Sequence, residues 1–261
     1  MKYKLLNSLV FLFLLIFSFN SLSDDSLKDA VNNELRGTEN INRDKYRNPY
    51  ETLSFFEISK EKKVLEVTPG AGWYTEIISK YMQSSKNFYV LMYDKPKLDI
   101  IKKIQNKFLK KFDNNKPFGS VKKIYFNENL DVDHKGNYFD LILTFRNSHN
   151  WLQMKKAEKA YNSFSKLLKK GGVLGVVQHR ASFNNKNNFA KGYVKESFLI
   201  KLIENQGFKF IEKSEINANP RDLKNYKKGV WSLPPRFSDG KKTQYLNIGE
   251  SDRMTLKFIK L

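Results

Sequence analysis

A chain of 261 residues with 40% hydrophobic residues can form one α/β domain with a buried core, which excludes a mainly disordered protein. The formal net charge of +20 comes mostly from lysines spread along the chain. That spread argues against a nucleic-acid partner and leaves contact with an anionic envelope surface open. The absence of cysteine excludes disulfides, thiolate zinc sites and cysteine nucleophiles.

The first 23 residues have the order of a secretory signal peptide. Lys2 and Lys4 precede an apolar run over 5–19, and small residues at 21 and 23 suit the positions that a signal peptidase reads. The run is shorter than the roughly 20 apolar residues that span a bilayer, and an uncleaved membrane anchor is the alternative. We therefore expect an exported, periplasmic protein whose mature chain begins near Asp24.

The remaining chain alternates between strand and helix patterns. Residues 24–42 are polar and predict a loose N-terminal arm with some helix, and residues 43–56 predict a helix with Pro49 in its first turn. Seven runs predict strands: 63–67, 88–93, 121–126, 139–145, 173–178, 208–216 and 254–260. Further helices are predicted over 73–82, 98–112, 155–168 and 195–205, the third ending at Gly171 and Gly172. The alternation predicts a doubly wound, largely parallel sheet in one domain over 43–261.

A glycine-rich turn joins the first predicted strand to the helix that follows it. Residues 64–75 read Val-Leu-Glu-Val-Thr-Pro-Gly-Ala-Gly-Trp-Tyr-Thr, with Gly70 and Gly72 in the turn. Glycines allow a sharp turn and close approach of a ligand, although an ordinary strand-to-helix turn is the alternative. Asp94 follows the second strand, where a carboxylate binds ribose hydroxyls in nucleotide-binding sheets. A plain loop acid is the other interpretation of Asp94.

These patterns resemble class I S-adenosylmethionine-dependent methyltransferases. The similarity rests on Glu-Val-x-Pro-Gly-x-Gly, the acid after the second strand, Phe-Asp-Leu-Ile-Leu-Thr-Phe over 139–145 and Leu-Lys-Lys-Gly-Gly over 168–172. The chain is most similar to a bacterial group of exported predicted methyltransferases with no assigned substrate. That group shares residues 46–56, the Pro-Gly-Ala-Gly-Trp-Tyr-Thr turn, 146–151 and 248–254, so the similarity covers nearly all of the mature chain.

The resemblance implies a Rossmann-like seven-stranded sheet with an antiparallel last strand and S-adenosylmethionine as the cofactor. Gly70 and Gly72 would pass under the methionine part, and Glu66 would hold its amino group through a water molecule. Asp94 would bind the ribose, and Asn127, after the third strand, would contact the adenine.

The turn departs from the family pattern at one position. Tyr74 replaces the usual third glycine of the turn. The rings of Trp73 and Tyr74 are therefore expected to crowd the start of the helix, which predicts an altered pose of the cofactor.

Polar residues follow the fourth strand, where this fold presents the methyl acceptor. Arg146, Asn147 and His149 are the candidate catalytic residues, and their polarity favours a small anionic acceptor. His149 is a candidate general base because an imidazole pKa lies near neutrality, with local capping or packing as the alternative. His179, after the fifth strand, is a candidate substrate contact or a structural hydrogen-bonding residue. The three scattered histidines lack ligand spacing, so we expect no metal.

The stretch 217–253 is the longest irregular segment. A structureless connection of this length is unusual in a compact domain. Strand six should deliver the chain to the carboxyl edge of the sheet, where ligands bind, and the resemblance implies that strand seven starts there. We therefore predict a lid over the acceptor pocket with Trp231 and Arg253 facing it, and a packing flap is the alternative.

Two functions follow from these residues. The first is an exported enzyme that transfers a methyl group from S-adenosylmethionine to a small-molecule acceptor. The second is a noncatalytic exported binding protein of the same fold for a nucleoside-like or envelope ligand. The cofactor residues favour the enzyme, whereas a location outside the cytoplasm, where the cofactor is made, favours the binding protein.

Overall fold

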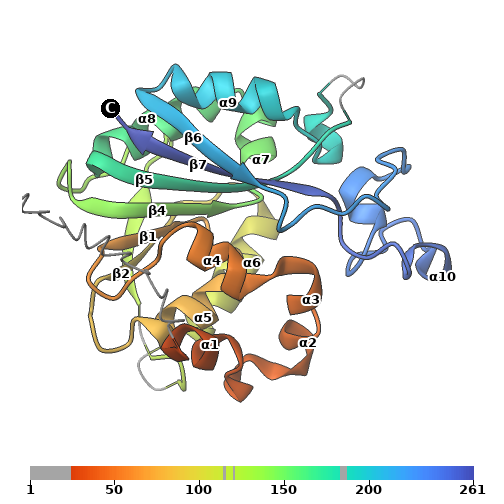
Figure 1. The fold of residues 1–261 in the computed structure, drawn as a ribbon, viewed down its shortest axis with the longest axis horizontal. Coiled ribbons are helices and arrows are strands. Elements are labelled where there is room, and N and C mark those ends of the chain that lie inside the picture. The colour runs from red at the N-terminus through yellow and green to blue at the C-terminus, as the bar shows by residue number, and fades with distance from the viewer. Residues whose placement is uncertain (1–24, 114–115, 120, 183–186) are drawn as a thin grey trace, which may run out of the picture.

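A seven-stranded sheet runs through the centre of the molecule (Figure 1). The structure is a computed structural model and describes residues 25–113, 116–119, 121–182 and 187–261; the predicted signal peptide lies outside them. The strands are β1 (Val64–Val67), β2 (Phe88–Tyr93), β3 (Lys122–Phe126), β4 (Phe139–Phe145), β5 (Leu168–His179), β6 (Phe208–Ser214) and β7 (Arg253–Lys260). Their order is β3-β2-β1-β4-β5-β7-β6, and β7 runs antiparallel to β5 and β6, whereas the other pairs are parallel. The predicted doubly wound sheet with an antiparallel last strand is confirmed.

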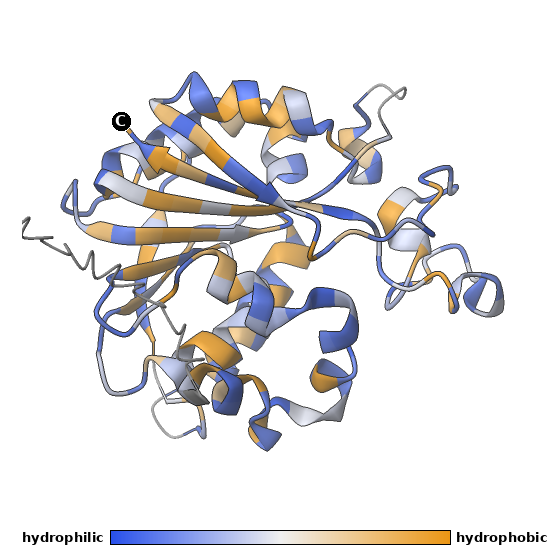
Figure 2. Ribbon diagram, in the orientation of Figure 1, coloured by the Kyte–Doolittle hydropathy of each residue, from blue (hydrophilic) through white to orange (hydrophobic). Residues whose placement is uncertain are grey.

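Helices cover both faces of the sheet. One apolar core lies beneath α1 (Asp25–Val31), α4 (Pro49–Phe55), α5 (Trp73–Tyr81) and α6 (Asp99–Lys111). The other lies beneath α7 (Ser148–Gln153), α8 (Ala157–Leu167) and α9 (Glu196–Glu204). Because side chains alternate along a strand, Val64 enters the first core and Leu65 the second. The central strands are therefore apolar on both faces, and Figure 2 shows them as largely hydrophobic. Among the residues described, no helix is both long and apolar enough to cross a membrane.

Short elements complete the chain. The N-terminal part also contains the 3-10 turn η1 (Glu34–Arg36) and the helices α2 (Gly37–Ile41) and α3 (Asp44–Arg47). The later connections contain η2 (Phe189–Lys191), η3 (Gly229–Ser232) and α10 (Lys242–Tyr245).

The N-terminal arm is packed, so the expectation of a loose arm is wrong for residues 25–42. Leu27 and Ala30 of α1 are buried in the first core, against α5. The Arg36 guanidinium forms a two-pronged ion pair with Asp44, with both nitrogen–oxygen distances at 2.7 Å. The polar composition concealed a narrow apolar stripe, which is enough to dock a short helix.

Two helix boundaries differ from the prediction. The helix expected over 43–56 is divided at Asn48, whose φ of 39° is left-handed, and Pro49 starts α4. Gly171 and Gly172 do not end α8, which stops at Leu167; they lie inside β5. A Cβ on Gly172 would approach the Lys169 carbonyl oxygen to 2.9 Å, so the glycine is needed by an irregularity at the start of the strand.

Candidate functional site

The order in which the chain adds strands reverses between β1 and β4: β2 and β3 extend the sheet on one side of β1, and β4 lies on its other side. Ligands of open α/β sheets bind at the carboxyl ends of strands at such a point. Asn147, expected to be catalytic, connects these ends, because its amide donates to the Val67 carbonyl at 3.0 Å and to Thr144 Oγ1 at 3.1 Å. Its observed contacts therefore position the two strand ends.

The two glycines of the turn have different surroundings. Gly70 has a φ of 63°, and nothing lies within 4 Å of the position that a Cβ would occupy. Gly72 has a φ of 88°, and its Cβ would overlap the ring of Phe112 from the segment after α6. Gly70 therefore leaves an open face at the carboxyl edge, whereas Gly72 is required by backbone conformation and by packing.

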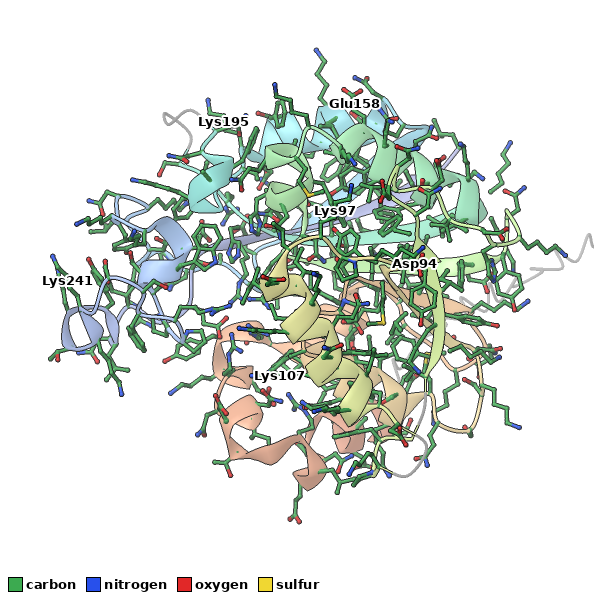
Figure 3. All side chains as sticks on the ribbon, turned by 180° about the vertical axis from the view of Figure 1, so that it is seen from behind. Asp94, Lys97, Lys107, Glu158, Lys195 and Lys241 are labelled. Atoms are coloured by element: carbon green, nitrogen blue, oxygen red, sulfur yellow. The ribbon has the colours of Figure 1, made fainter. Side chains whose placement is uncertain are left out.

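Several polar groups near this turn are suited to an adenosyl cofactor. The Thr68 hydroxyl is buried and has no hydrogen-bond partner within the described chain. The Asp94 carboxylate is exposed at the end of β2 (Figure 3), and no described side chain pairs with it. Glu66 is 2% exposed and accepts a 2.6 Å hydrogen bond from Thr75, and burial raises its pKa to about 8. An orphaned hydroxyl, an unpaired carboxylate and an open glycine fit a ligand with ribose hydroxyls and an ammonium group.

The large residues after the turn pack into the protein. The Trp73 ring contacts two guanidinium groups, whose central carbons lie 4.5 Å (Arg47) and 5.0 Å (Arg36) from the ring centroid, and its indole donates to the Asn40 carbonyl. The Tyr74 ring stacks on Phe145 with centroids 3.7 Å apart. Neither ring lies within 4 Å of the Cβ position of Gly70, so the predicted crowding does not extend to its open face.

Asn127 is part of a self-contained turn after β3. Its side-chain oxygen accepts hydrogen bonds from the backbone of Asn129 and Asp131, at 2.8 and 3.0 Å. The side chain is exposed, and its proposed contact with adenine stays a prediction.

His149 lies at the start of α7, a helix that sequence reasoning missed. The side chain is buried and contacts Gln178, with 3.4 Å between Nδ1 and Oε1. The expectation of a near-neutral pKa is wrong, because burial, together with the charge of Arg146, lowers the pKa of His149 to about 4 despite the Gln178 contact. The imidazole is therefore uncharged at neutral pH.

His179 and Trp231 join His149 at the same edge. The His149 ring centroid lies 5.5 Å from that of His179 and 5.8 Å from that of Trp231. The Nδ1 atom of His179 is 2.6 Å from the Ser251 hydroxyl, and burial holds the pKa of His179 well below its ordinary value. Three predicted site residues from distant parts of the sequence thus form one aromatic cluster.

Arginines form the third part of the site, around Glu250. Arg253 lies opposite His179 in the β5–β7 ladder, and its Nη1 pairs with Glu250 at 3.1 Å. Arg47 also pairs with this carboxylate, at 3.0 Å. Arg146 is half-buried, with a left-handed φ of 65°, and burial lowers its pKa to about 10.

Sequence reasoning missed Arg47 and Gln178. Both lie inside runs that read as ordinary helix and strand, and the only signal for Arg47 was that residues 46–56 belong to the resemblance.

Among the described residues, no group of three metal-ligating side chains is present. Two surface hollows, of about 390 and 330 Å³, contain none of the predicted site residues.

The segment 217–253 projects from the carboxyl edge of the sheet, as Figure 1 shows. It has a small apolar cluster of its own and packs through Trp231 and Val230 on Tyr193.

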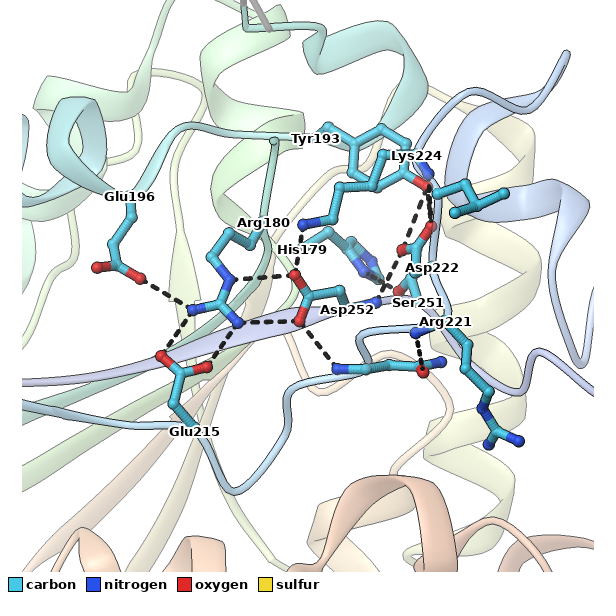
Figure 4. A network of polar contacts seen from close by, with 12 residues as sticks. His179, Arg180, Tyr193, Glu196, Glu215, Arg221, Asp222, Lys224, Ser251 and Asp252 are labelled. Carbon is cyan, nitrogen blue, oxygen red and sulfur yellow. Dashed lines mark hydrogen bonds and ion pairs between the residues drawn. The ribbon is translucent and has the colours of Figure 1, made fainter. Parts of the chain in front are cut away.

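Ion pairs also hold the segment. Asp252 pairs with Arg180, which also pairs with Glu215 and Glu196 (Figure 4). The segment is therefore anchored to the stretch that follows β5, through the apolar contact with Tyr193 and the ion pair with Arg180.

Comparison with known proteins identifies the fold. No protein-family model and no curated protein sequence matches this chain. A SAM-dependent methyltransferase from Aquifex aeolicus is 14% identical, with a TM-score of 0.56 over 91% of this chain and 98% of its own. The phosphoethanolamine N-methyltransferase 2 of Haemonchus contortus, solved with S-adenosyl-L-methionine, is 14% identical, with a TM-score of 0.56 over 90% of this chain and 57% of its own.

The same fold also occurs with another activity. The [4+2]-cyclase SpnF has a TM-score of 0.54 at 13% identity and covers 82% of this chain and 80% of its own. At these identities the likeness shows the fold alone, and that fold is the class I methyltransferase fold.

Proposed function

We propose that this protein is exported and transfers a methyl group from S-adenosylmethionine to a small anionic acceptor. The observation that carries the proposal is the exposed Asp94 carboxylate at the carboxyl end of β2, beside an open turn at Gly70. A carboxylate at this place can accept hydrogen bonds from two ribose hydroxyls. The class I methyltransferase fold supports the same cofactor.

Different residues of the chain bind the cofactor and the acceptor. The cofactor, when bound, supplies a methyl group on a sulfonium ion. Gly70 allows its close approach, and Glu66 holds the ammonium group through water. Arg146 and Arg253 hold the negative charge of the acceptor, because guanidinium groups bind oxyanions in a two-pronged manner.

The aromatic cluster completes the acceptor side. His149 hydrogen-bonds the acceptor as an uncharged imidazole, since its pKa of about 4 makes it a weak base. Trp231, 5.8 Å from His149, excludes water from the reacting group.

Calorimetry with S-adenosylmethionine and S-adenosylhomocysteine tests the cofactor. Asp94→Asn should weaken binding by about 1.5–3 kcal/mol, the contribution of a hydrogen bond to a charged group. Glu158→Gln is the matched control, because Glu158 is also exposed and lies well away from Asp94 (Figure 3). Equal affinities of the two variants would remove Asp94 from the site, and no binding to the unmodified protein would refute the proposal.

A further inference from the structure

Three arginines pair with one carboxylate beside the proposed acceptor site, and the charge of a fourth acts on it. Glu250 Oε1 lies 2.7 Å from Arg43 Nε, and its Oε2 lies 3.0 Å from Arg47 Nε and 3.1 Å from Arg253 Nη1. Arg146 adds a fourth positive charge that acts on Glu250 without an ion pair in the described chain. Burial alone would raise the pKa of Glu250, but the four guanidiniums outweigh it and hold the pKa well below its ordinary value. Four positive charges against one negative charge leave the cluster with a net charge of +3.

The cluster also contains donors without acceptors. The Nη1 and Nη2 atoms of Arg47 and the Nε atom of Arg253 are buried and have no hydrogen-bond partner within the described residues. Arg47 is 1% exposed, and burial, followed by the charge of Arg146, lowers its pKa well below the ordinary value. Leaving buried charged donors unpaired is destabilising, so a bound anion would stabilise this arrangement. The edge of the cluster is exposed to solvent at Arg146, which is half-buried, and at Arg43, whose side chain is 22% exposed.

We infer that Arg47, Arg146 and Arg253 bind a doubly charged oxyanion, a phosphomonoester group carried by the methyl acceptor. A single carboxylate would leave a net charge of +2, whereas a phosphomonoester dianion leaves +1 and offers three oxygens to the free guanidinium nitrogens. The arginines lie next to the aromatic cluster, since Arg146 precedes His149 by three residues and Arg253 pairs with His179 across the ladder. The assignment to the acceptor rests on the proposed function, whereas the anion site itself rests on the charges and the unpaired donors.

Calorimetry with inorganic phosphate, at constant ionic strength set with chloride, tests the anion site. Phosphate should bind, and acetate should bind at least about tenfold more weakly, which equals about 1.4 kcal/mol. Arg146→Gln should weaken phosphate binding by about tenfold or more, and it leaves no unpaired carboxylate because Arg146 has no ion-pair partner among described residues. Arg221→Gln is the matched control, since Arg221 is exposed in the same half of the chain and its side chain points away from the network in Figure 4.

Two results would overturn the anion site: no phosphate binding beyond that in chloride, or equal losses in Arg146→Gln and Arg221→Gln. If the glutamine variant does not fold, Arg146→Lys makes the same comparison, because lysine keeps the charge and loses the planar fork.

Competition between phosphate and the cofactor distinguishes the acceptor from the cofactor as the source of the anion. If the anion belongs to the acceptor, phosphate and S-adenosylmethionine bind together, and Arg146→Gln changes the affinity for S-adenosylmethionine less than about twofold, or about 0.4 kcal/mol. If phosphate displaces S-adenosylmethionine but not its decarboxylated analogue, the cluster holds the cofactor carboxylate and the acceptor assignment is wrong. Phosphate binding without any cofactor binding would refute the proposed function and leave the anion site standing.

Discussion

Glu66 shows how burial sets the chemistry of a single residue. Its carboxyl group is 2% exposed, has one hydroxyl partner and has a pKa raised to about 8 by burial. It is therefore mostly uncharged at pH 7 when no cation lies beside it. Because the folded pKa exceeds the ordinary value of 4.5, its contribution to the free energy of unfolding is full below pH 4.5 and is lost as the pH rises through 8.

Cofactor binding should change the ionisation of Glu66. An ammonium group nearby favours the carboxylate, so binding at pH 7 should release close to one proton from this residue. Titration calorimetry in two buffers of different ionisation enthalpy measures that release. In Glu66→Gln, which resembles the protonated form in shape, the release should vanish and the affinity should fall. Identical binding enthalpies in both buffers for the unmodified protein would contradict the assignment.

Burial of His149 is expected to make the stability of the folded protein sensitive to acid. Its pKa is about 4 in the folded chain and 6.5 when exposed, so the unfolded chain takes up the proton first as the pH falls. This contribution to the free energy of unfolding is full above pH 6.5 and decreases by about 3 kcal/mol toward pH 4. Urea unfolding of the unmodified protein and of His149→Gln, at several pH values in this window, should show a shallower pH dependence in the variant. Parallel curves would contradict the low pKa.

At the scale of elements, the glycine turn is held by the helix packed against it. Gly72→Ala should lower the free energy of unfolding by about 2–4 kcal/mol, because it combines left-handed backbone strain with overlap on Phe112. Gly70→Ala should cost only the strain of about 1–2 kcal/mol, since its Cβ meets open space. Urea denaturation compares the two variants. The order should reverse in cofactor affinity, where Gly70→Ala should have the larger effect; equal losses of stability would show that Phe112 does not constrain the turn.

The segment 217–253 is held down by specific hydrogen bonds. The Tyr193 hydroxyl donates to Asp222 at 3.1 Å, and Asp222 also accepts from the backbone of Asp252 at 2.8 Å (Figure 4). Tyr193→Phe removes one hydrogen bond, of about 1–2 kcal/mol, so amides of 217–253 should exchange about fivefold to thirtyfold faster with deuterium. Amide exchange in the strands should be unaffected.

Tyr125→Phe is the control, because Tyr125 is exposed and has no hydrogen-bond partner in the described chain. Equal rates of amide exchange in the two variants would mean that Tyr193 does not anchor the segment.

At the scale of the whole molecule, the proposed export has a direct test. Mass spectrometry of the protein from its native cell should give a mature N-terminus near Asp24, because the charged, apolar and small-residue order of residues 1–23 suits cleavage there. An intact Met1 on a protein recovered from the cytoplasm would contradict export.

Much of the fold could be predicted from local sequence alone. Apolar runs and helical spacing are properties of neighbouring residues, so all seven strands were placed correctly, although β5 starts five residues earlier than predicted. The glycine turn and Asp94 belong to the same class of signal, since each follows directly from a strand end. The break between α3 and α4 at Asn48 was not predicted, because one continuous helix and two short helices show the same local pattern of apolar and polar residues.

The arrangement of the proposed acceptor site depends on the tertiary structure. His149, His179 and Trp231 were named from sequence, but nothing in their spacing fixed a contact among residues separated by up to 82 positions. The meeting of Arg47 with Glu250, 203 residues apart, depends on where α3 docks and where β7 begins. Charge and burial act through space and not along the chain. The sequence by itself therefore determined the sheet and its glycine turn, whereas only the folded chain decided the pKa values and the net charge of the site.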